Sequence, residues 1–151
     1  MSLFDQVSAD IVTAMKSRDK VTLEALRNVK KSFLEAKTAP RANDTLTDDA
    51  ALKILQKLVK QGKDSAAIYT EQARPDLAEA ELAQVSVMER YLPAALTDEE
   101  LTAALRDIIA SIGATGPKDM GRVMGIATKQ LAGKAEGRAI SAKVKELLSQ
   151  N

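Results

Sequence analysis

The sequence contains no histidine and no cysteine among its 151 residues. Without cysteine, disulfides, cysteine nucleophiles and thiolate metal sites are excluded. Without histidine, Ser–His–Asp triads and histidine-ligated zinc are excluded as well. The sequence also lacks a phosphate-loop motif, a dinucleotide-binding motif and an acidic pair typical of a metal site. We therefore assign no catalytic residue, expect neither a metal nor a cofactor, and lean against an enzyme.

Aromatic residues are scarce, with two Phe, two Tyr and no Trp, which leaves little surface on which nucleobases could stack. The net charge of +1 argues against a protein that coats polyanions generally. No apolar run approaches the roughly 18 residues of a membrane span. Asp5 and Asp10 interrupt the apolar stretch that a signal peptide needs. We expect a soluble cytoplasmic protein without a membrane partner.

Apolar residues recur at three- and four-residue steps through nearly the whole chain, which predicts an all-α fold. Ser2 is a suitable N-cap for the first helix, and Pro75 forces a new helix to start. Residues 38–47 form a polar loop. The segment from Thr97 to Glu100 reads as a capping box, because a Thr precedes a Glu by three residues. These signals predict seven helices, and the residues from Pro117 to Gly133 form the sixth.

Gly62 lies centrally on the apolar side of the helix expected after Thr47 and up to about Ala73. A glycine inside a helix costs about 1 kcal/mol relative to alanine. We therefore predict that another helix packs closely against Gly62.

A domain boundary is predicted at Tyr91-Leu92-Pro93, since Pro93 disfavours helical backbone at Leu92. The prediction is an N-terminal four-helix domain at residues 1–92 and a C-terminal three-helix domain at residues 94–151. The chain before Pro93 has 14 basic and 14 acidic residues, whereas the part from Gly113 onward has seven basic and three acidic residues. The positive charge is thus concentrated in the part of the C-terminal domain from Gly113 onward, with a net charge of +4 that the neutral total hides.

A helical wheel at 100° per residue separates two sides of the segment after Gly116. The apolar side contains Met120, Val123, Met124, Ala127 and Leu131. The opposite side contains three cations and two glycines: Lys118, Arg122, Lys129, Gly121 and Gly125. Glycine bares the backbone and costs helix stability, so these positions favour a close approach by another group. Three readings remain open: an RNA phosphate backbone, another helix with the cations in solvent, or a protein partner.

Two further groups of charged residues are expected to have no part in binding. Lys53, Lys57 and Lys60 form a second cationic stripe, typical of a solvated helix face. Asp119 is expected to cap or neutralise a helix N-terminus.

Several motifs together resemble the YqeY proteins over essentially the whole chain. They are Lys63-Asp64-Ser65, Arg74-Pro75-Asp76-Leu77, Tyr91-Leu92-Pro93 and the segment from Asp119 to Gly125, followed by Gly133 and Gly137. The C-terminal part of that family (the GatB/YqeY domain) is similar to the tail of the B subunit of tRNA-dependent amidotransferases. The resemblance implies the same four-plus-three helical fold and a tRNA-contacting tail. It also implies that carbon–nitrogen ligase chemistry with glutamine as amido donor resides in other parts of that larger enzyme.

We expect a non-catalytic tRNA-binding or tRNA-related accessory protein. The candidate RNA contacts are Lys118, Arg122, Lys129, Lys134 and Arg138, with Gly121 and Gly125 as close-approach positions. The alternative is a protein–protein adaptor that docks through the C-terminal domain, for example in an amidotransferase or aminoacylation complex. An isolated carbon–nitrogen ligase is the least supported of the three.

Overall fold

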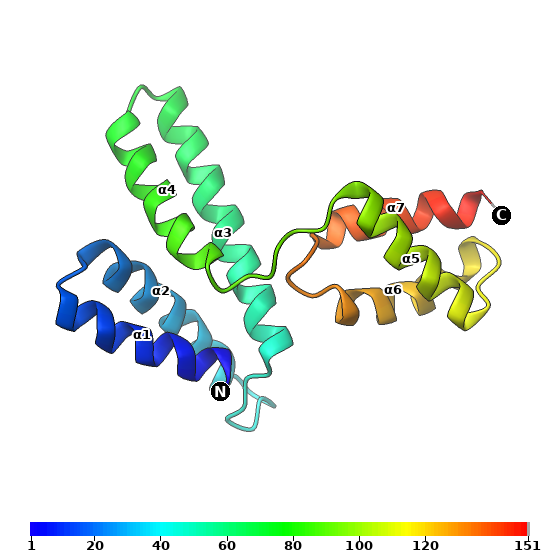
Figure 1. Cartoon of the computed structure of the whole chain (residues 1–151), viewed down its shortest axis with the longest axis horizontal. Helices are drawn as coiled ribbons and strands as arrows, with labels where there is room; N and C mark the ends of the chain where they lie inside the picture. Colours follow the sequence, from blue (N-terminus) through cyan, green and yellow to red (C-terminus); the bar gives the residue numbers. More distant parts are fainter. Residues whose placement is uncertain (151) are drawn as a thin grey trace. The chain divides into compact units, whose positions relative to one another are not determined.

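The computed structural model describes residues 1–150, which are built from helices and contain no strand (Figure 1). The all-α prediction is confirmed. The α-helices are α1 (Leu3–Ser17), α2 (Lys20–Lys37), α3 (Asp48–Glu71), α4 (Pro75–Glu89), α5 (Asp98–Ile112), α6 (Met120–Gln130) and α7 (Gly137–Ser149). A 3₁₀ turn, η1 (Pro117–Asp119), directly precedes α6.

The chain divides into two compact units, Met1–Leu92 and the residues from Pro93 onward. The first unit contains α1–α4, and the second contains α5–α7 with η1. The division lies within the Tyr91-Leu92-Pro93 segment.

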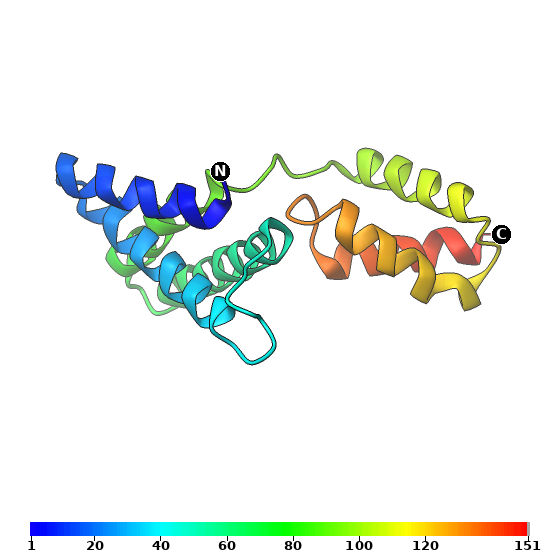
Figure 2. The same cartoon turned by 90° about the horizontal axis from the view of Figure 1, so that it is seen from below.

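The N-terminal unit consists of two helical hairpins, α1 with α2 and α3 with α4 (Figure 2). Its core contains the fully buried side chains of Val7, Leu26, Phe33 and Leu55. Local signals start the helices as expected: the Ser2 hydroxyl accepts a hydrogen bond from the Asp5 N–H, at 3.1 Å.

Gly62 is buried at the contact between α3 and α4. A Cβ atom added to Gly62 would lie 2.5 Å from Cγ2 of Val85, a distance that real Cβ atoms essentially never show. The predicted close approach of another helix to Gly62 is confirmed.

The C-terminal unit has a separate core, with Leu105, Val123, Ala127 and Leu148 fully buried. Helix α5 begins with the predicted capping box. The Thr97 hydroxyl accepts from the Glu100 N–H and Glu100 Oε1 accepts from the Thr97 N–H, each at 3.1 Å.

The sixth helix is shorter than the sequence predicted. The residues from Pro117 form the 3₁₀ turn, α6 starts only at Met120, and it ends at Gln130, before Gly133. At the N-terminal end of this segment, the Asp119 carboxylate accepts hydrogen bonds from backbone N–H groups of the preceding loop, and these bonds stabilise the 3₁₀ turn. After Gln130 the chain continues in non-helical turns, within which Gly133 adopts a left-handed φ of 78°.

Candidate nucleic-acid interface

The outward face of α6 carries Gly121 and Gly125, both of them exposed. Val123 and Ala127, on the opposite side of the helix, are fully buried. A Cβ atom added to either glycine would meet no heavy atom within 4 Å. Packing within the C-terminal unit therefore does not require these glycines. They leave a stretch of helix backbone without side-chain cover.

Four exposed cations lie on or close to this helix in the sequence: Lys118, Lys129, Lys134 and Arg138. Lys118 belongs to η1, Lys129 to the last turn of α6, Lys134 to the following loop and Arg138 to the first turn of α7. Within residues 1–150 none of the four forms an ion pair with an acidic side chain. Their charges are therefore available to an external anion. Because Lys118 lies in a 3₁₀ turn, the α-helical wheel places it only approximately.

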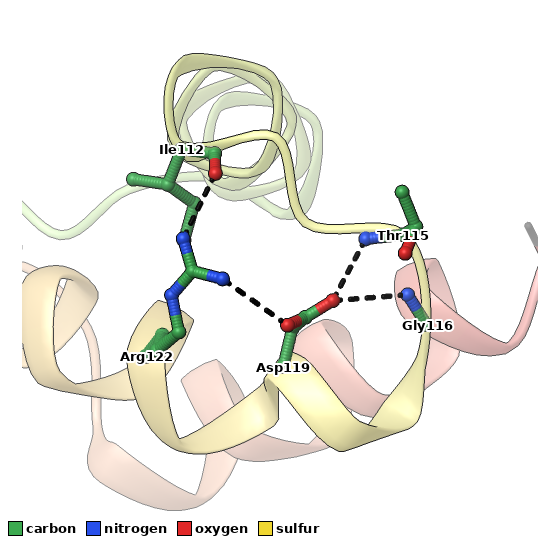
Figure 3. Close-up of polar contacts among 5 residues, drawn as sticks. All are labelled: Ile112, Thr115, Gly116, Asp119 and Arg122. Atoms are coloured by element: carbon green, nitrogen blue, oxygen red, sulfur yellow. Dashed lines mark hydrogen bonds and ion pairs between the residues drawn. The ribbon is translucent and has the colours of Figure 1, made fainter.

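Arg122 is exposed on the same helix, but its guanidinium is already engaged (Figure 3). Nη2 donates to the carbonyl oxygen of Ile112 at 3.0 Å, and Nη1 donates to Asp119 Oδ1 at 3.3 Å. Ile112 is the last residue of α5, where carbonyl groups have no partner inside the helix. Arg122 thus connects the start of α6 to the end of α5. The sequence did not reveal this role.

Asp119 is the centre of this loop, and its side chain is only 12% exposed. One carboxylate oxygen, Oδ2, accepts from the N–H groups of Thr115 at 2.9 Å and Gly116 at 3.4 Å (Figure 3). The hydrogen bond from Thr115 contributes most to holding the pKa of the Asp119 carboxyl below its ordinary value. Partial burial acts in the opposite direction, and the Gly116 hydrogen bond and the charge of Arg122 lower this pKa further. Asp119 therefore remains ionised and organises the segment before α6.

Lys143 is one of the seven basic residues from Gly113 onward, but its charge is paired with carboxylates of the same unit. Its ammonium lies 3.1 Å from a carboxylate oxygen of Asp98 and 3.4 Å from one of Glu146, and its side chain is only 15% exposed. The hydrogen bond to Asp98 is the main reason why the pKa of Lys143 is raised. Helix periodicity alone could not identify this contact, because Asp98 is 45 residues away.

The stripe of Lys53, Lys57 and Lys60 is exposed along α3, in the N-terminal unit. Within residues 1–150 no group of three or more carboxylates is arranged to hold a metal ion. No helix in the same range has the length and apolar character of a membrane span.

Three similar curated proteins share the name "Altered inheritance of mitochondria protein 41, mitochondrial". The one from Pyrenophora tritici-repentis is 26% identical over 146 residues, covering 95% of this chain and 79% of the relative. The one from Kluyveromyces lactis is 27% identical over 139 residues, covering 90% and 70%. The one from Meyerozyma guilliermondii is 37% identical over 84 residues, covering 55% and 42%.

These relatives contradict the expectation of a cytoplasmic protein, because all three are named as mitochondrial. Composition and the absence of a long apolar run do not distinguish one aqueous compartment from another, which is why the sequence argument was wrong on this point. The family comparison agrees with the motif-based resemblance. A family model described as "Yqey-like protein" matches residues 4–148, so the chain belongs to the YqeY family.

Proposed function

We propose that this protein is a non-catalytic accessory factor that binds tRNA through the outward face of α6 and the basic residues beside it. The observation that carries the proposal is the bare backbone at Gly121 and Gly125, which no part of the C-terminal unit covers. Free cations precede and follow these glycines along the chain, at Lys118 and Lys129.

The chemistry of this face suits a phosphate backbone better than nucleobases. The two glycines let a ribose–phosphate chain come near the helix axis, and the lysine ammonium groups neutralise phosphates. No Trp is present to stack on a base, and both Tyr residues belong to the N-terminal unit. Recognition would therefore depend on RNA shape and phosphate contacts, as is usual for proteins that bind structured RNA. The resemblance to an amidotransferase tail supports tRNA as the class of RNA.

Arg122 has a supporting role in this proposal. Its guanidinium holds the Asp119 loop and the end of α5, so it positions η1 and Lys118. Replacing Arg122 would disturb the loop as well as remove a charge, which makes Arg122 a poor choice for testing RNA contact.

The test is a triple replacement of Lys118, Lys129 and Lys134 by alanine, with tRNA binding measured over a series of salt concentrations. These side chains are exposed and unpaired, so folding should change little. Affinity should fall at low salt. The slope of log K against log salt should flatten by about two to three units if each lysine neutralises one phosphate.

A matched control removes the same number of charges from the other unit, at Lys53, Lys57 and Lys60. This control variant should retain nearly all of the tRNA affinity. Equal losses in both variants would show diffuse electrostatics and would refute a site on α6. No tRNA binding by the unmodified protein at low salt would refute the proposal altogether.

The second candidate is a protein adaptor, favoured by the spacing of Gly121 and Gly125. Glycines four residues apart lie on one helix face and form a shallow notch into which a partner helix could pack. An apolar contact of this kind should persist at high salt, whereas RNA should dissociate. Gly125→Leu should abolish such docking, while the triple lysine variant should leave it intact.

A further inference from the structure

The N-terminal unit contains a groove of about 510 Å³ between α1, α2 and the C-terminal end of α4. Ligand pockets in proteins typically have volumes of about 300–1,000 Å³, with an apolar lining and a few polar groups. Here the floor includes the buried side chains of Ala14, Leu26 and Val87. The proposed RNA contacts all lie in the other unit, so the tRNA proposal does not use this groove.

The groove is lined by Asp10 and Tyr91, residues that are 81 positions apart in the sequence. The Tyr91 hydroxyl donates a hydrogen bond to Asp10 Oδ2. Burial, followed by the interaction with Asp10, raises the pKa of Tyr91, so the phenol keeps its proton and remains a donor. Asp10 Oδ1 has no hydrogen-bond partner within residues 1–150.

Asp19 and Arg90 also line the groove. Asp19 accepts from the Thr22 N–H at 3.1 Å and from the Thr22 hydroxyl at 2.7 Å, and these bonds lower the pKa of Asp19. The Arg90 guanidinium forms no hydrogen bond or ion pair within the described chain. Its charge is nevertheless close enough to act on Asp19.

The groove thus presents two carboxylates and one guanidinium. A complementary ligand carries two cationic groups and one anionic group. The rest of the lining mixes polar side chains, such as those of Thr13 and Ser17, with apolar ones, so the ligand can also carry a short methylene stem between its charged groups. A basic α-amino acid has this combination: one carboxylate, one α-ammonium, and a second cation at the end of a methylene chain.

We propose that this groove binds a basic α-amino acid such as lysine or arginine. The ligand carboxylate pairs with Arg90, whose planar guanidinium suits a bidentate contact. The α-ammonium lies near Asp19, and the side-chain cation reaches the free oxygen of Asp10.

Isothermal titration calorimetry with the full chain tests the ligand class. L-lysine and L-arginine should each give a saturable isotherm with one site. Norleucine keeps the stem but lacks the terminal cation, 1,5-diaminopentane lacks the carboxylate, and Nα-acetyl-lysine lacks the α-ammonium. Each should bind at least about tenfold more weakly, because each loses one charge-assisted contact. The acetylated probe also distinguishes a free amino acid from the C-terminal residue of a peptide.

Two substitutions test the assignment of the charges. Arg90→Met should weaken lysine binding at least about tenfold and abolish the preference for lysine over 1,5-diaminopentane. Asp10→Asn retains an oxygen that can accept from Tyr91, and it should abolish the preference for lysine over norleucine. Arg27→Met and Asp5→Asn are matched controls, because both residues are exposed outside the groove, and they should bind as the unmodified protein does.

Three results would overturn the proposal. They are no saturable heat with lysine or arginine at millimolar concentrations, equal binding of lysine and its three truncated probes, and unchanged binding by the Arg90→Met protein. Tyrosine fluorescence during thermal unfolding monitors folding of the variants, since Tyr69 and Tyr91 both lie in the N-terminal unit.

Discussion

Replacing Gly62 by alanine adds one methyl group at the tightest contact between α3 and α4. The new carbon would lie 2.5 Å from Val85 Cγ2, well inside van der Waals contact. Val85 is 2% exposed and its side chain is stiff at χ1, so it cannot swing away into solvent. The two helices must therefore move apart or the valine must adopt a strained rotamer.

Two opposing effects determine the size of the change. Alanine is a better helix former than glycine by about 1 kcal/mol. Overpacking a well-packed core costs about 1–3 kcal/mol. The Gly62→Ala protein should therefore lose up to about 2 kcal/mol of unfolding free energy in the N-terminal unit.

A double-mutant cycle with Val85→Ala separates the two effects. Once the valine methyl groups are removed, only the helix propensity should remain. Gly62→Ala should then stabilise the protein by about 1 kcal/mol in the Val85→Ala background. The effect of the same substitution thus changes by about 1–3 kcal/mol between the two backgrounds.

Urea unfolding followed by tyrosine fluorescence is the appropriate assay, because both Tyr residues belong to the N-terminal unit. Far-UV circular dichroism, by contrast, reports both units. The slope of free energy against urea should stay constant across the four proteins of the cycle, as required for a change in native stability alone. Equal stabilisation by Gly62→Ala in both backgrounds would refute the close-packing argument.

Three further predictions concern the C-terminal unit. Gly121→Ala and Gly125→Ala should each stabilise the C-terminal unit by about 0.5–1 kcal/mol, as measured by urea unfolding, because the added methyl groups meet nothing within 4 Å. A loss of stability would show that the outward face of α6 is covered. Asp119 has a lowered pKa, so its stabilising contribution is complete above about pH 4 and is lost as the pH falls through the folded-state value. Asp119→Asn should therefore lower the unfolding free energy at neutral pH and make that free energy less dependent on pH below about 4. Acid titration of the circular dichroism signal measures this dependence. An unchanged acid profile would contradict the stabilising role of the Asp119 carboxylate. A fragment of residues 94–151 should be soluble and helical by circular dichroism, since this segment contains a core of its own; an unstructured fragment would show that the two units depend on one another.

The orientation of the candidate site could be predicted from the sequence because it depends on helix periodicity. The wheel placed Gly121 and Gly125 away from Val123 and Ala127, and the burial of these residues agrees. The predicted start of the sixth helix at Pro117 was wrong, because the α-helix begins at Met120. A proline at the first position fits both an α-helix and a 3₁₀ turn, so the sequence could not distinguish them. The choice between them was made by the Asp119 hydrogen bonds.

The sequence by itself determined the helical class and most helix ends. Both follow from interactions among residues a few positions apart, such as the capping box from Thr97 to Glu100. Only the tertiary structure decided which charges remain free. It pairs Lys143 with Asp98 across 45 residues and joins Tyr91 to Asp10 across 81 residues. Contacts over such separations depend on how whole helices pack, and local periodicity carries no information about which distant side chain a charge will meet.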